Sequence, residues 1–264
     1  MIQMPFFTIA TFNVNSVRSR LHILERWLSA NPVDVLCLQE TKVTDDQFPL
    51  SAFESWGYHV FFRGKKGYSG VAIACQNEPE EVIYGFPDGK NPRDDDRLMI
   101  ARFGDIWVIN TYVPQGKSIV HPDYRYKKDF LMRFLEMLES QFNDEDKILW
   151  VGDMNVAPEE KDVTKPETKR NHVCFHEEIR DLFDTVKSWG FMDVFRKHHP
   201  EEGQFTFWDY RVKNAFERNI GWRVDHILAT RPLAERSVDC YIDREPRIWE
   251  RPSDHTILVG IFDI

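Results

Sequence analysis

Short apolar runs, rich in β-branched and aromatic residues, recur along the whole chain and limit its fold more than any other feature. Runs of this length, separated by polar segments that contain Gly or Pro, predict β-strands. We expect strands over residues 6–13, 33–40, 58–63, 70–75, 98–103, 106–113, 147–152, 223–229 and 255–262.

Three other segments place apolar side chains at helical spacing, over residues 19–29, 125–142 and about 176–189. Many strands with few helices predict β-sheets packed together, with helices on their outer faces. The chain has 264 residues, no internal repeat and no Gly/Ser linker. We therefore expect residues 1–264 to form a single domain.

The charge balance limits the possible partners. Lys and Arg number 34 against 43 Asp and Glu, a net charge of −9 that disfavours loose wrapping of a polyanion and attraction to acidic membranes. Nucleic acid stays possible, because acids gathered in one cleft can bind divalent cations. The four cysteines form no CxxC pair, and the first 17 residues lack the basic region of a signal peptide. These features predict a cytoplasmic protein that does not bind membranes.

Several predicted strands end on polar residues that the apolar pattern does not require. In layered α/β domains the strand ends meet at one rim, where ligands bind. Further acids and a histidine stand beside the strands near the C-terminus. The whole set is Asn13, Asn15, Glu40, Asp153, Asn155, Asp225, Asp254 and His255.

Each of these residues alone is more often a turn former or a helix cap. Together they form an oxygen-rich set without cysteine, which suits Mg²⁺ or Mn²⁺ better than structural zinc. Phosphodiester hydrolysis needs an activated water, stabilisation of phosphoryl charge and protonation of the leaving oxygen. Glu40 can hold a metal, Asp153 can orient or deprotonate water, and His255 can contact a phosphoryl oxygen. We expect the other histidines to be surface or packing residues.

Eight sequence blocks occur in an order that matches a known family. They are NVNSVR (13–18), LQETK (38–42), KGYSGVAI (66–73), YVPQG (112–116), GDMNVAP (152–158), FTFWDYR (205–211), NIGWRVD (219–225) and PSDH (252–255). Any one block is weak, but the eight in order span nearly the whole chain. The chain resembles the exonuclease III-type abasic-site (AP) endonucleases of the endonuclease/exonuclease/phosphatase superfamily.

This resemblance implies a DNase I-like four-layer α/β sandwich, in which two mixed β-sheets pack face to face with helices outside. It also implies a monomeric Mg²⁺-dependent enzyme, with Mn²⁺ as an alternative ion, that cleaves double-stranded DNA 5′ to abasic sites. Further activities in the family are a 3′→5′ exonuclease and a 3′-phosphatase or phosphodiesterase on 3′-blocked ends. Alternatives are a less specific metal-dependent DNA nuclease, a superfamily phosphatase of inositol phosphates or sphingolipids, and a non-catalytic DNA- or protein-binding module.

The resemblance also implies roles for individual residues. It leaves open which of Asp153 and His255 handles which proton, and whether one metal or two act. The implied metal ligands are Glu40, Asn13 and Asp254, and the implied catalytic residues are Tyr112, Asp153, Asn155, Asp225 and His255.

An abasic sugar must leave the helix to be inspected, and a compact apolar pocket accepts a deoxyribose that lacks its base. Phe207, Trp222 and Val224 match the residues that line such a pocket in the family. We expect Trp208, in the same block, to belong to the core.

Contacts to DNA phosphates must come from local basic clusters. We expect Lys66, Lys117, Arg211 and Arg218 to bind DNA, and Gln115 to enter the kinked duplex. The cluster around Lys117 also contains Arg125, Lys127 and Lys128. The polar segment 158–172 is expected to be a mobile or DNA-facing loop.

Overall fold

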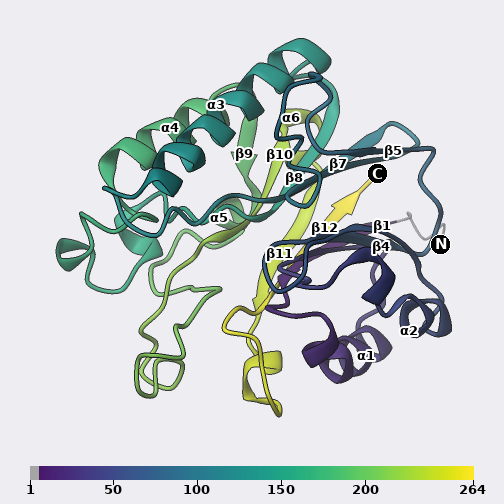
Figure 1. Cartoon of the computed structure of the whole chain (residues 1–264), viewed down its shortest axis with the longest axis horizontal. Helices are drawn as coiled ribbons and strands as arrows, with labels where there is room; N and C mark the ends of the chain where they lie inside the picture. Colours follow the sequence, from purple (N-terminus) through teal and green to yellow (C-terminus); the bar gives the residue numbers. More distant parts are fainter. Residues whose placement is uncertain (1–5) are drawn as a thin grey trace.

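Figure 1 shows the architecture in a computed structural model, which describes residues 6–264. Two six-stranded sheets pack face to face, and helices cover their outer faces. The first sheet has the order β11 (Ser237–Asp243), β12 (Ile257–Asp263), β1 (Phe6–Asn13), β2 (Val35–Gln39), β4 (Val71–Cys75) and β3 (His59–Arg63). The second has the order β5 (Glu81–Tyr84), β6 (Leu98–Phe103), β7 (Ile106–Tyr112), β8 (Lys147–Asp153), β10 (Asp225–Thr230) and β9 (Phe191–Asp193).

Both sheets are mixed, because β1 pairs with β2, and β7 with β8, in parallel, whereas the other neighbours are antiparallel. The predicted four-layer sandwich is therefore confirmed. Helices α1 (Leu21–Ala30) and α2 (Leu50–Ser55) lie on the first sheet, and α3 (Pro122–Gln141) and α4 (Glu177–Lys187) lie on the second. Two short helices are α5 (Val194–His198) and α6 (Arg231–Ala234).

Short 3₁₀ turns complete the regular structure: η1 (Arg18–Arg20), η2 (Asp45–Gln47), η3 (Glu160–Asp162), η4 (Pro166–Thr168) and η5 (Glu245–Ile248). Within residues 6–264 every helix is too short or too polar to cross a membrane.

The central strands read as continuous apolar runs because both of their faces are buried. In β8, Leu149 and Val151 pack into the core between the two sheets. Ile148 and Trp150, which alternate with them, pack into the core beneath α3 and α4. A third core lies between the first sheet and the helices α1 and α2. One strand therefore contributes to two apolar layers.

The structure contains all nine predicted strands and all three predicted helices, with small shifts at their ends. The prediction omitted β5, β9 and β11, and each of these lies at an edge of its sheet. Edge strands are less buried, as at Val238 in β11, which is half exposed. Their apolar pattern is therefore weaker. The short helices α2, α5 and α6 were also missed, since a few residues cannot show a helical period.

A buried amide joins the two sheets. Asn110 of β7 has no exposed surface, and its Nδ2 donates to the main-chain oxygens of Leu38 (3.1 Å) and Ala72 (2.9 Å) in the first sheet. Its Oδ1 accepts from Gln39 Nε2 at 2.7 Å, and Gln39 Nε2 also donates to Thr11 Oγ1 at 3.0 Å. Apolar contacts are non-directional, so these hydrogen bonds fix how the sheets align.

Replacing Asn110 by Leu should lower the free energy of unfolding by about 3 kcal/mol or more, because several buried polar groups would lose a partner. Urea denaturation measures the change. Asn77→Ala, at an exposed position, serves as the control and should change stability little. Wild-type stability of the Asn110→Leu chain would contradict this role of the amide.

Candidate active site

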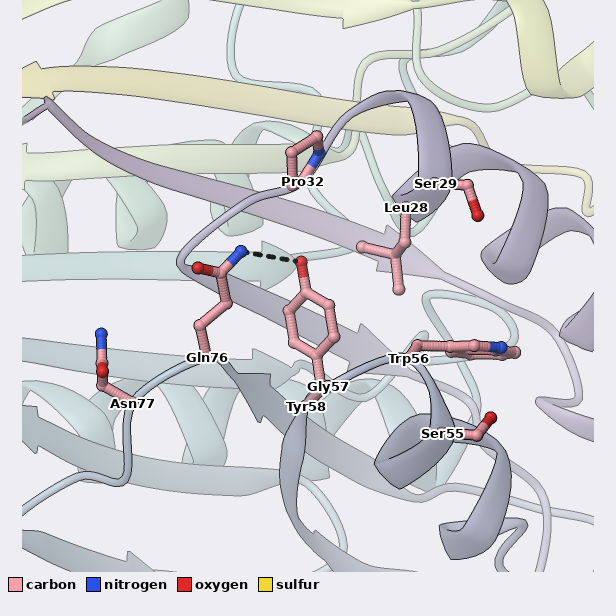
Figure 2. Close-up of a pocket in the computed structure, with 9 residues that line it drawn as sticks. All are labelled: Leu28, Ser29, Pro32, Ser55, Trp56, Gly57, Tyr58, Gln76 and Asn77. Atoms are coloured by element: carbon pink, nitrogen blue, oxygen red, sulfur yellow. Dashed lines mark hydrogen bonds between the residues drawn. The ribbon is translucent and has the colours of Figure 1, made fainter.

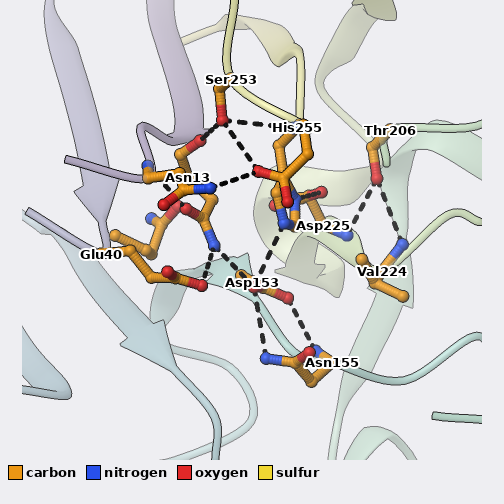
Figure 3. A network of polar contacts seen from close by, with 12 residues as sticks. Asn13, Glu40, Asp153, Asn155, Thr206, Val224, Asp225, Ser253 and His255 are labelled. Atoms are coloured by element: carbon orange, nitrogen blue, oxygen red, sulfur yellow. Dashed lines mark hydrogen bonds and ion pairs between the residues drawn. The ribbon is translucent and has the colours of Figure 1, made fainter. Parts of the chain in front are cut away.

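Polar side chains from both sheets meet at one rim of the sandwich (Figure 3). Asn13 ends β1, and Glu40 follows β2, so both lie at the carboxyl ends of parallel strands of the first sheet. Asp153 ends β8 of the second sheet. Asp225 begins the antiparallel strand β10, and its register partner is Asp153. The topology thus places residues far apart in the chain at the same rim.

Glu40, Asp153 and His255 form a cluster that could hold a metal, because their candidate ligand atoms lie within 4.8 Å of one another. Asn13 Nδ2 donates to Glu40 Oε1 and to Asp153 Oδ2, both at 2.9 Å. This amide links two carboxylates that would otherwise repel each other. Lys42 Nζ lies 2.6 Å from Glu40 Oε2. Lys42 was not among the predicted site residues, although the LQETK block contains it.

The backbone at the rim has positive φ values at and beside the candidate site residues. Glu40 and Asn155 have φ values of 51° and 50°, in the left-handed region that side chains other than Asn and Asp rarely adopt. Gly152, directly before Asp153, has a φ of 132°. A Cβ at Gly152 would lie 2.0 Å from the main-chain oxygen of Thr111. Glycine therefore lets β8 approach β7 closely where Asp153 leaves the strand.

His255 lies between two carboxylates. Its Nδ1 is 2.8 Å from Asp225 Oδ2, and its Nε2 is 3.9 Å from Asp153 Oδ2. Burial disfavours the charged imidazole, but Asp225 and Asp153 outweigh burial and raise the pKa of His255. Burial also raises the pKa of Asp153, against the attraction of His255. The pair holds a proton more tightly than either side chain does in water.

Two further residues of the predicted catalytic set lie close to these carboxylates. Burial, with the charges of Glu40 and Asp153, raises the pKa of Tyr112, so its hydroxyl stays protonated. The main-chain N–H of Asn155 donates to Asp153 Oδ1 at 2.9 Å, and Asn155 Nδ2 donates to Asp153 Oδ2 at 3.2 Å. For Glu40, Lys42 and Asn13 outweigh burial and lower its pKa, so this carboxylate is ionised.

Asp254 lies beside this cluster. Its Oδ1 accepts from Asn15 Nδ2 at 2.9 Å, and Asn15 Oδ1 accepts from Lys42 Nζ at 2.6 Å. Within residues 6–264 the cluster that could hold a metal consists of Glu40, Asp153 and His255 and does not include Asp254. Asp254 nevertheless lines the same cavity as Glu40.

A cavity of about 680 Å³ adjoins the carboxylates. Phe207, Trp222 and Val224 line it together with Asp153 and His255. Phe207 and Trp222 exchange main-chain hydrogen bonds of 2.9 Å in both directions, and the Phe207 ring lies 4.8 Å from the His255 ring. The structure therefore brings the predicted pocket residues next to the cluster of Glu40, Asp153 and His255.

His172 adds to this wall, whereas Trp208 is not part of the cavity lining. Trp208 has no exposed surface, as the sequence analysis expected. His172 lines the cavity, and its ring lies 4.4 Å from the ring of Trp222. The sequence analysis missed His172, because it carries no acidic neighbour and meets Trp222 only in the folded chain.

Another hollow, of about 560 Å³, lies between α1 and α2 (Figure 2). Pro32 lines it, before the start of β2, whereas Glu40 lies beyond the other end of that strand. The hollow is therefore at the opposite end of the first sheet. Its lining contains no acid, histidine or cysteine: Leu28, Ser29, Pro32, Ser55, Trp56, Gly57, Tyr58, Gln76 and Asn77.

The residues predicted to bind DNA are all exposed, but only some adjoin the cavity. Gln115, Lys117 and Arg211 line it. Lys117 lies 2.8 Å from Asp123, and Arg211 lies 2.7 Å from Asp209. The remaining two, Lys66 and Arg218, are exposed but are not part of its lining. The inclusion of Lys127 in the surface cluster was wrong, because its side chain is completely buried.

A buried ion-pair network supports the wall of the cavity. Arg223, between Trp222 and Val224, donates to Asp162 through Nε (2.7 Å) and to Asp193 through Nη2 (2.8 Å). Arg196 also contacts Asp162. Asp162 belongs to the segment 158–172, which the sequence analysis treated as a mobile or DNA-facing loop. The structure instead buries this side chain completely, so the prediction was wrong for Asp162.

The network predicts a pH-dependent loss of stability in Asp162→Asn. Burial alone would raise the pKa of Asp162, but the charges of Arg223 and Arg196 outweigh this effect and lower it. Its charge therefore stabilises the fold above the unfolded pKa of about 3.9, and this contribution is lost as the pH falls below that value. We expect a deficit of about 3 kcal/mol at pH 7 that shrinks below about pH 4.

Urea denaturation of the wild type and of Asp162→Asn, at pH 7 and at values below about pH 4, measures this deficit in the free energy of unfolding. Asp129→Asn, at an exposed ion pair with Arg125, is the matched control and should differ little from wild type at any pH. A deficit that stays constant down to low pH would show that the charge of Asp162 does not act in this way.

Comparisons with known proteins agree with this geometry. The family model described as the Endonuclease/Exonuclease/phosphatase family matches residues 10–255. Exodeoxyribonuclease III of Haemophilus influenzae is 38% identical over 257 residues, which cover 93% of this chain and 96% of the relative.

Solved structures are similar over almost the whole chain. An AP endonuclease from Archaeoglobus fulgidus is 53% identical, with a TM-score of 0.95 and coverage of 98% of this chain and 100% of that one. A 3′ phosphatase from Neisseria, bound to a product DNA hairpin, is 34% identical, with a TM-score of 0.90 and the same coverage. The chain therefore belongs to the Endonuclease/Exonuclease/phosphatase family.

Proposed function

We propose that this protein is a divalent-metal-dependent DNA repair enzyme that cleaves duplex DNA 5′ to abasic sites. It also acts on 3′ ends, as a 3′→5′ exonuclease and a 3′-phosphatase. The observation that supports this most strongly is the contact between an acidic metal-binding cluster and an aromatic-walled cavity. The names of its relatives, which include AP endonucleases, an exodeoxyribonuclease III and a 3′ phosphatase, support the same activities.

The donor atoms of the cluster suit a hard divalent cation, and we propose Mg²⁺. Glu40 and Asp153 offer carboxylate oxygens, and no cysteine belongs to the cluster. Glu40 would be the main ligand, with Asn13 and Asp254 nearby. When bound, the ion supplies positive charge that stabilises the phosphoryl group during cleavage.

The protein side chains supply the remaining chemistry. Asp153, with its raised pKa and two N–H donors from Asn155, is placed to accept a proton from the attacking water. His255, protonated and oriented by Asp225, donates to a phosphoryl oxygen. The protonated Tyr112 hydroxyl donates to the same phosphate.

Substrate selection depends on the cavity beside these groups. The rings of Phe207 and Trp222, with Val224, form an apolar wall for a deoxyribose turned out of the helix. Exposed side chains at the rim, including Gln115, Lys117 and Arg211, contact the DNA around it. The local positive groups offset the net charge of −9. We also propose that the protein acts in the cytoplasm as a monomer with a single domain.

The direct test is a set of duplexes carrying an abasic site, a 3′-phosphate, a recessed end or no lesion, each incubated with and without EDTA. We expect metal-dependent cleavage of the damaged substrates. Asp153→Asn and His255→Ala should each lower the rate by about 100-fold or more, since each removes charge or proton transfer in the transition state. Glu40→Gln should shift the Mg²⁺ titration to higher concentrations. Cleavage that survives EDTA, or near-wild-type variants, would contradict the mechanism.

Selectivity is tested with the double variant Phe207→Ala and Trp222→Ala. Removing the wall should reduce the preference for abasic over intact duplex, because the pocket no longer fits the sugar. The control is Phe48→Ala, which removes a ring stacked on Phe62 on the outer side of the first sheet. Unchanged preference in the double variant would favour a less specific nuclease.

A further inference from the structure

Lys127 is a charged residue placed where the fold normally places apolar ones. It lies on the same face of α3 as the buried residues Tyr124, Phe130 and Leu131, and its own exposed fraction is zero. Burying an ammonium group costs a large free energy unless its N–H groups find partners. Burial accordingly lowers the pKa of Lys127. The position therefore needs an explanation.

Three main-chain oxygens surround the Lys127 ammonium. Nζ donates to Asn155 O at 2.6 Å, to Val173 O at 2.8 Å and to Gln115 O at 3.3 Å. An ammonium group has three N–H donors, whereas a neutral amine has two, so three acceptors match the protonated form. Within residues 6–264 the polar partners of Nζ are carbonyls, with no carboxylate within ion-pair distance.

These carbonyls come from three separate segments that border the active site. Gln115 follows β7 and lines the cavity, and Asn155 follows β8 and donates to Asp153. Val173 lies between His172 and Cys174, which both line the cavity. The segment of Gln115 leads into α3, whereas those of Asn155 and Val173 lie beyond α3 in the sequence. Lys127 connects all three to one well-packed helix.

The local backbone is shaped around this contact. A Cβ at Gly116, which has a φ of 96°, would lie 3.4 Å from Lys127 Cδ and 3.3 Å from the Tyr124 ring, so the segment passes close over α3. In Asn155 the left-handed backbone turns the carbonyl toward Lys127 while the N–H points to Asp153. Holding that carbonyl therefore also holds the donors of Asn155 on the carboxylate.

We propose that Lys127 is a positioning residue of this active site, which fixes the segments of Gln115, Asn155 and Val173 from beneath. The proposal rests on the proposed function. Lys127 acts through Asn155 on Asp153, and through Val173 on the wall formed by His172 and Trp222. Its contact with Gln115, whose segment carries the rim residue Lys117, is the longest of the three at 3.3 Å, so the loss of Lys127 should affect turnover more than binding of DNA.

His172 provides a signal that reports the Lys127 charge. Burial, together with the charges of Lys127 and Lys169, lowers the pKa of His172 to about 4. Removing the ammonium should raise this pKa, whereas a change in packing alone removes no charge. Lys127→Arg retains the charge and donors, and should keep the pKa of His172 low.

The experiment compares Lys127→Met and Lys127→Arg with Leu138→Ala, a core truncation farther along α3 that should destabilise the fold without touching these segments. For each protein, kcat and KM are measured on the abasic duplex, the Kd for DNA is measured in EDTA, and the pKa of His172 is measured by NMR. We expect Lys127→Met to lower kcat by about 10-fold to 100-fold, as displacement of reacting groups does. The Kd should change little and the pKa of His172 should rise. Lys127→Arg should recover part of kcat.

A Lys127→Met protein with wild-type kcat, or a loss of kcat matched by Leu138→Ala, would overturn the proposal. If Lys127→Met does not fold, ¹⁵N NMR of the wild-type lysines decides: ammonium protons protected from exchange support it, and a neutral or freely exchanging amine overturns it. Failure of the wild type to cleave abasic DNA would refute the proposed function instead, and the pKa of His172 would still report on Lys127.

Discussion

The alignment of the two sheets is the constraint on which the site depends. No single segment carries the candidate site: Asn13 and Glu40 come from the first sheet, and Asp153 and Asp225 from the second. A shift of one sheet over the other would separate the carboxylates, and apolar packing alone resists such a shift weakly. The hydrogen bonds from Asn110 to the strands β2 and β4 are directional, and they therefore set the spacing at the rim.

The site also requires that buried negative charge be balanced. Asn13 bridges Glu40 and Asp153, and Lys42 pairs with Glu40. Asp225 Oδ1 has no hydrogen-bond partner among the described residues, so the other oxygen, Oδ2, carries its contact with His255. This arrangement keeps ionised groups close together beside the wall of the cavity formed by Phe207, Trp222 and Val224. A divalent cation at the cluster would complete the balance.

The sequence was most informative where burial is complete. Central strands such as β8 are apolar on both faces and could be predicted, whereas the edge strands β5, β9 and β11 could not. The motifs pointed to candidate site residues at strand ends, and the structure brings Glu40, Asp153 and His255 together. The sequence analysis missed His172 because its contact with Trp222 forms only in the folded chain. It missed Lys42 because only the structure shows the ion pair with Glu40.

Lys127 shows a different limit of prediction from the sequence. Its charge and its neighbours in sequence indicated a surface cluster, yet its spacing from Tyr124 and Leu131 placed it on the buried face of α3. The helical period was therefore the better guide than residue type. Only the folded chain shows the three carbonyls that make burial of the ammonium possible.

The most direct measurement of the central claim is the position of the metal. Crystals grown with Mn²⁺ and measured at its absorption edge would locate the ion by anomalous scattering. The account predicts a peak within about 2 to 2.5 Å of a Glu40 carboxylate oxygen, beside Asp153 and next to the cavity wall. A fully occupied ion bound elsewhere, with none near Glu40, would contradict it.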